Sequence, residues 1–268
     1  MSRSFMREKK IYCGSEYMEV DIIPRTQNQE TYVKGKRSKK VRESLPKQKD
    51  LNDKNSKRRL VQIGNANFGI GDYHVSLTYT DANRPKTPEE AEIILINHIR
   101  RIKRKMKKEG LGELKYIVVT EYYYSKNEEE NIKIHHHLIM NGGLDRNTVE
   151  DLWCKRRKRG EKKGESLGYV NADRLQPNEN GIEAMCKYIV KRPQNKKSWS
   201  GSQNLIRPCS RTNDNKYSKR KVEKLAKDNS NKKEFEKIYP QYEITSVVTE
   251  YYEDTGWHIY LKMWKRKE

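Results

Sequence analysis

The chain has 268 residues, and its 58 Lys and Arg against 37 Asp and Glu give a formal net charge of +21. Only 33% of the residues are hydrophobic and 35% are charged, which allows one medium-sized domain and leaves part of the chain outside any core. No stretch approaches the roughly 18 to 20 apolar residues of a membrane span, and the charged N-terminus lacks the apolar core of a signal peptide. We therefore expect a cytoplasmic protein with no membrane partner, whose charge attracts the phosphate backbone of nucleic acid.

The first 60 residues are largely polar and basic, with dense charge at Lys34–Arg42 and at Lys54–Arg59. Such a composition offers little apolar surface to bury. We expect a loosely ordered arm that contacts nucleic acid, with a plain solvated tail as the alternative.

A strand at Tyr73–Asp81 and a helix follow the basic segment. Thr87 and Pro88, followed by two glutamates, form a good helix N-terminus. Apolar residues then recur at helical spacing as far as Met106, and Gly110 marks the end.

Two runs rich in β-branched, aromatic and aliphatic residues come next, at Leu114–Tyr124 and Ile132–Met140. The polar segment Ser125–Asn131 between them has the composition of a turn, so the runs predict a β-hairpin. If the turn is centred near Glu128, antiparallel pairing places Glu121 opposite His135. A register slip of one residue would send Glu121 to the other face.

The second run contains three consecutive histidines, His135, His136 and His137. Residues two apart in a strand share a face, so His135 and His137 point one way and His136 points the other. With Glu121 they predict two imidazoles and one carboxylate around an open metal site, which suits Mn²⁺ or Mg²⁺. The alternative is that the histidines are satisfied core residues and that Glu121 is solvated.

After a predicted helix at residues 147–157 and a short strand near Tyr169, the segment Gly181–Pro193 has helical apolar spacing. Tyr188 and Lys191 are three apart and lie on one flank of that helix. Beside a cation and a metal-polarised phosphate, a phenolic oxygen can attack phosphorus and form a covalent ester. Lys191 could neutralise charge on the phosphoryl oxygens. An ordinary surface pair is the alternative.

The remaining chain is basic at first and then regains secondary structure. Residues 194–220 predict a loop over the site or a linker, and Lys221–Tyr239 predicts a polar helix. Tyr242–Trp264 predicts two strands around the turn at 254–256, either joined to the main sheet or forming a small subdomain.

At these residues the sequence resembles the HUH endonucleases, and within them the rolling-circle replication initiator (Rep) proteins of plasmids and phages. Tyr73–Asp81 is similar to the strand of the family's first motif, His135–Met140 to its histidine motif, and Lys187–Lys191 to its tyrosine motif. The similarity covers about residues 70–195, and the stretch Lys197–Leu205 resembles an element that follows the tyrosine helix in some Rep proteins.

The resemblance implies that Tyr188 nicks single-stranded origin DNA, keeps the 5′ end as a phosphotyrosyl ester and frees a 3′-hydroxyl that primes synthesis. It also implies metal ligation by His135 and His137, with Glu121 as the third ligand. A host polymerase would extend the primer. Because the chain lacks a helicase-type phosphate loop, unwinding would fall to a separate host helicase.

Two positions depart from the family pattern. His136 stands where relatives usually have an aliphatic residue, so it could in principle compete for the metal. Some relatives carry a second tyrosine four residues from the first, whereas here Ala184 and Arg192 flank Tyr188 at that distance. We expect a single catalytic tyrosine.

The expected fold is α+β, an antiparallel sheet flanked by helices as in the HUH endonucleases. We expect a loosely ordered arm over 1–60, the nickase domain over 61–195, and a basic linker with a helix and hairpin over 196–268. A transposase or a plasmid-mobilisation relaxase is a close variant of this function. The alternative from a different class is a non-catalytic basic nucleic-acid-binding protein.

Overall fold

A computed structural model describes most of the chain and divides it into two compact units. The described residues are 4–31, 45–124, 132–161, 163–191, 199–228 and 230–267. The first unit joins both ends of the chain, Met1–Ala66 with Ile206–Glu268, and the second unit is Asn67–Leu205. The boundaries therefore fall at 66 and 205, where the sequence predicted 60 and 195.

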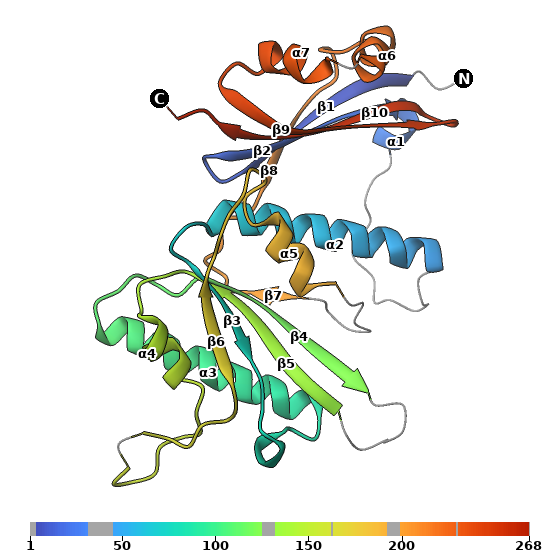
Figure 1. Ribbon diagram of the computed structural model, residues 1–268. Helices are drawn as coiled ribbons and strands as arrows, with labels where there is room; N and C mark the ends of the chain where they lie inside the picture. Colours follow the sequence, from blue (N-terminus) through green and yellow to red (C-terminus); the bar gives the residue numbers. More distant parts are fainter. Residues whose placement is uncertain are drawn as a thin grey trace. The chain divides into compact units, whose positions relative to one another are not determined.

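The second unit is built on a five-stranded antiparallel sheet (Figure 1). In sheet order its strands are β6 (Val170–Arg174), β3 (Tyr73–Leu77), β5 (Ile132–Met140), β4 (Tyr116–Tyr124) and β7 (Ser200–Gly201). Its helices are α3 (Pro88–Lys108), α4 (Arg146–Asp151) and α5 (Glu183–Ile189), with a 3₁₀ turn at Asp81–Asn83. The predicted order of strand, helix, hairpin, helix, strand and tyrosine helix is confirmed, and so is the α+β class.

The helix α3 covers one face of this sheet. Its N-cap Thr87 accepts a hydrogen bond from the backbone N–H of Glu90, Pro88 opens the first turn, and Gly110 follows its end with φ +69°. A periodic stripe of apolar side chains on α3 packs against alternate residues of the strands, among them Val75, Val118 and Leu138. The residues between these, at odd positions of β4 and β5, lie on the opposite face.

The first unit has its own five-stranded antiparallel sheet, made from both ends of the chain. In sheet order its strands are β8 (Cys209–Asn213), β1 (Ser4–Cys13), β2 (Tyr17–Thr26), β10 (Gly256–Lys265) and β9 (Tyr242–Tyr252). Its helices are α1 (Gln27–Glu30), α2 (Pro46–Asn67), α6 (Lys219–Lys227) and α7 (Asn231–Ile238). Apolar residues of α6 and α7 pack on one face of the sheet through Val222, Leu225 and Phe235.

The prediction of a loosely ordered arm over residues 1–60 is wrong for the described part, because β1 and β2 form the middle of this sheet. The charges that suggested solvation are paired inside the unit. Glu19 and Asp21 are buried in β2, and Arg58 of α2 donates hydrogen bonds to both carboxylates at 2.6–3.0 Å. The basic run Lys34–Arg42 lies outside the described residues.

The C-terminal predictions hold in outline and differ in detail. The two strands around the turn at 254–256 are confirmed as β9 and β10, and β10 pairs with β2, so the hairpin joins the sheet of the first unit. The single polar helix expected over Lys221–Tyr239 is two helices, because the chain leaves helical geometry at Asp228. No helix in the described part of the chain is long and apolar enough to cross a membrane.

Candidate metal and tyrosine site

The hairpin of β4 and β5 places a carboxylate and two imidazoles together. The strands pair Glu121 with His135, which confirms the predicted register. Nε2 of His135 lies 3.1 Å from Oε2 of Glu121, and the rings of His135 and His137 meet edge to face with centroids 5.0 Å apart. One potential ligand atom from each of the three residues falls within 4.8 Å of the others.

The chemistry of this group fits a divalent cation. Glu121 and His137 are each about 5% exposed, and His135 is half-buried. Burial, together with the neighbouring histidines, lowers the pKa of His137 to about 4. The ring is therefore neutral at pH 7 and keeps a lone pair for a metal. Two nitrogens and one carboxylate oxygen leave coordination positions for water or phosphate oxygens.

His136 lies on the other face of β5 and is fully buried. Its Nε2 is 2.7 Å from the hydroxyl of Tyr79, and its Nδ1 is 2.8 Å from the hydroxyl of Thr120. Burial lowers its pKa to about 3. Both ring nitrogens are occupied by these hydrogen bonds, so His136 does not compete for a metal at the opposite face.

A further histidine, His74 of β3, reaches the group from the other side of β5. Nε2 of His74 lies 3.1 Å from Nδ1 of His137, and the two rings stack with centroids 5.3 Å apart. Burial lowers the pKa of His74. The contact uses Nδ1 of His137 and leaves its Nε2 for a metal ligand bond. Sequence reasoning missed His74, although its alternation with Tyr73 and Val75 could have placed it on the site face.

Tyr188 projects from α5 beside these imidazoles. Cys186 and Ile189 of the same helix are buried, whereas Tyr188 is 58% exposed. Its ring stands edge-on to His137 at 5.6 Å and to His74 at 6.4 Å between centroids. The phenol is therefore next to the candidate metal ligands and still accessible to a large substrate.

Lys191 lies beyond the tyrosine helix, which ends at Ile189, so the predicted helical continuation to Pro193 is wrong. Its backbone N–H donates to the carbonyl of Tyr188 at 3.2 Å. Lys191 is exposed, and its ammonium group has no ion pair within the described part of the chain. The structure thus places Lys191 near Tyr188 along the chain without bringing its charge onto the phenol. Arg192 and Pro193 lie outside the described residues.

A family model described as a replication-associated protein of the ORF2 type matches residues 72–193. The matched segment is similar to a Rep protein. Its bounds enclose the strands β3 to β6 and the helix α5, and so they include every residue of the candidate site. Comparisons with curated proteins and with solved structures gave no match. The match supports a replication-associated protein, and with it binding to DNA.

Proposed function

We propose that this chain is a metal-dependent HUH endonuclease that nicks and transfers single-stranded origin DNA to initiate rolling-circle replication of a plasmid or phage. The observation that carries the proposal is the position of Tyr188, whose exposed ring stands against His137 and His74 at the edge of the Glu121, His135 and His137 group. A replication-associated family match over the same segment supports it.

In the proposed reaction the phenolic oxygen of Tyr188 attacks a backbone phosphorus. A new phosphorus–oxygen bond joins the tyrosine to the 5′ side, the bond to the 3′ oxygen breaks, and the 3′ oxygen takes up a proton as the phenol loses one. The product is a 5′-phosphotyrosyl ester and a free 3′-hydroxyl. Attack by a 3′-hydroxyl on this ester would reverse the chemistry and rejoin strands.

Glu121, His135 and His137 would hold Mn²⁺ or Mg²⁺, which supplies Lewis-acid stabilisation of the phosphoryl oxygens when bound. His74 fixes the ring of His137 through its hydrogen bond, and this contact sets which nitrogen of His137 carries the proton. Lys191 would approach the phosphate with its ammonium group once DNA is bound. Exposure of Tyr188 gives a single strand direct access to the nucleophile.

The proposed partners follow from the same chemistry. Single-stranded origin DNA is the substrate, a host polymerase extends the 3′-hydroxyl, and a separate host helicase unwinds the duplex. The formal net charge of +21 favours DNA and makes binding salt-dependent.

The decisive experiment incubates the purified protein with labelled single-stranded origin fragments and Mn²⁺, and follows adducts that survive denaturation. We expect an adduct in wild type, none in Tyr188→Phe, and an undiminished yield in the matched control Tyr169→Phe, whose ring is 80% exposed. No adduct in any of the three proteins, across candidate origins and metals, would favour the non-catalytic nucleic-acid-binding protein instead.

A further inference from the structure

The face of the second unit that α3 covers carries a strongly basic hollow. It has a volume of about 670 Å³ and lies between α3 and the segment that follows α4. Arg101 and Arg104 line it from α3, and three consecutive residues, Lys155, Arg156 and Arg157, line it from the other wall. We call these five residues the α3 hollow.

The charges of the α3 hollow are poorly compensated. Among the described residues that line it none is acidic, and the one ion pair of the five cations joins Lys155 to the exposed Glu165. An exposed pair of this kind contributes little. Burial lowers the pKa of Arg101, and the nearby Arg104 lowers it further. Crowding like charges costs folding free energy, which an anionic ligand would recover.

The wall of the α3 hollow is held in place before any ligand binds. The carbonyl of Leu152 accepts a hydrogen bond from Nε of Arg101 at 3.0 Å and lies 3.1 Å from Nδ1 of the buried His98. Trp153 is buried next to it and donates its indole N–H to the carbonyl of Thr78 at 2.7 Å. These contacts tie the segment to the core, so its cations are presented from a fixed backbone.

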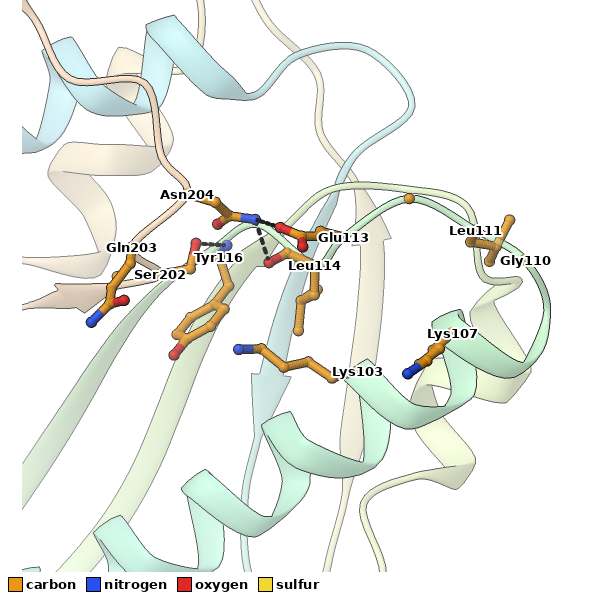
Figure 2. A pocket seen from close by; sticks show the side chains of 12 residues that line it. Lys103, Lys107, Gly110, Leu111, Glu113, Leu114, Tyr116, Ser202, Gln203 and Asn204 are labelled. Carbon is orange, nitrogen blue, oxygen red and sulfur yellow. Dashed lines mark hydrogen bonds between the residues drawn. The ribbon is translucent and has the colours of Figure 1, made fainter.

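The composition of the hollow points to phosphates rather than to bases. No aromatic side chain is among its described lining residues, and single-strand binding usually relies on aromatic stacking. The hollow at the other flank of α3 is different, as Figure 2 shows: there Lys103 lies over the ring of Tyr116 at 5.7 Å, and Glu113 also lines the wall.

The α3 hollow is also separate from the tyrosine site. Strand residues that pack under α3, such as Val118 and Leu138, alternate with those of the metal group, such as Glu121 and His137. A ligand at the α3 hollow therefore approaches the opposite face of the sheet from the one that carries Tyr188.

We propose that the α3 hollow binds the phosphate backbone of double-stranded DNA, as a second nucleic-acid site on the face away from the tyrosine. It would hold the duplex that adjoins the nicked single strand, without reading its sequence. Arg and Lys contacts to phosphates position a protein on a duplex and specify no bases.

The test measures binding to a duplex oligonucleotide of unrelated sequence, over a range of salt concentrations, without metal and in the Tyr188→Phe background. The variant R104Q/R156Q/R157Q removes three charges from the hollow and leaves Arg101 in place. The matched control K219Q/R220Q/K224Q removes three exposed charges from α6 of the other unit. Thermal unfolding of both variants checks the fold.

We expect the hollow variant to bind duplex about tenfold or more weakly, with a log–log salt slope shallower by about 2 to 3, because each lost phosphate contact removes about 0.9. The control should bind as before. Equal losses in both variants, or an equal loss for a short single strand, would overturn the proposal, as would competition by inorganic tripolyphosphate stronger than by duplex.

This result is independent of the proposed nicking. Adduct formation by the hollow variant on a short single strand, in a background that retains Tyr188, should equal that of wild type. If wild type forms no adduct, the proposed function fails while the duplex measurement still decides the role of the α3 hollow.

Discussion

The two faces of strand β5 carry the same residue type in different surroundings. His136 faces α3, where Tyr79 and Thr120 occupy both of its ring nitrogens. His135 and His137 face the other way, where a carboxylate and further imidazoles gather beside an exposed tyrosine. One face satisfies its polar atoms within the fold, and the other keeps potential ligand atoms together. The difference teaches that position within the strand, more than the presence of histidine, separates a structural role from a chemical one.

The largest expected effect is on metal binding by His137→Ala. Removing one of three ligands should weaken Mn²⁺ binding by about 100-fold or more and abolish adduct formation, because replacing even an outer partner of a metal ligand costs roughly 10–100-fold. Calorimetric titration with Mn²⁺ measures the change. His258→Ala, which removes an imidazole from the other unit, should bind the metal as wild type does. Unchanged affinity in His137→Ala would place the metal elsewhere.

The opposite face should respond in stability instead. His136→Ala leaves the hydroxyls of Tyr79 and Thr120 without their partner and opens a cavity in the core, so we expect a loss of about 3 kcal/mol in the free energy of unfolding. Urea denaturation measures it. The folded fraction should still bind Mn²⁺ normally, and a loss of metal affinity without a loss of stability would reverse the assignment of the two faces.

Buried imidazoles on the α3 side should also make stability depend on pH. Burial lowers the pKa of His98 to about 4, below its usual value of 6.5. Because the unfolded chain binds the proton more readily, the stabilisation is present above about pH 6.5 and is lost as the pH falls toward 4, by up to about 3 kcal/mol. Urea midpoints from pH 7 to pH 4 should fall less steeply in His98→Gln than in wild type, and parallel profiles would refute this origin.

A smaller effect is expected for His74, which touches both His137 and Tyr188. His74→Ala should weaken Mn²⁺ binding about tenfold, at the lower end of the range for outer partners, because the ring of His137 loses its hydrogen bond. A conservative variant, His74→Gln, can restore a hydrogen bond and should recover part of the affinity. Equal affinities in all three proteins would show that His74 only fills space.

Much of this site could be predicted from local sequence, because strand alternation and a symmetric turn fix which residues share a face. The pairing of Glu121 with His135 and the separation of His136 both followed from these rules. His74 could not be assigned in the same way, since the pairing of β3 with β5 joins segments about 60 residues apart. The end of the tyrosine helix at Ile189 was also missed, which moves Lys191 off the helix flank.

The first unit was the least predictable region. Glu19 and Asp21 gave β2 the polar composition of a solvated segment, and only the long-range pairing with Arg58 explains how these carboxylates are buried. The sheet also combines β1 and β2 with β10, near the other end of the chain. Periodicity within a short window carries no information about such partners.

The most direct test of the account is to digest the denaturation-resistant adduct formed by wild type with single-stranded DNA and Mn²⁺, and to identify the modified peptide by mass spectrometry. We expect a nucleotide linked through phosphate to Tyr188, in the peptide that spans α5. Linkage to a different tyrosine, or an adduct that persists in Tyr188→Phe, would contradict the assignment of the nucleophile and with it the proposed role of the histidine face.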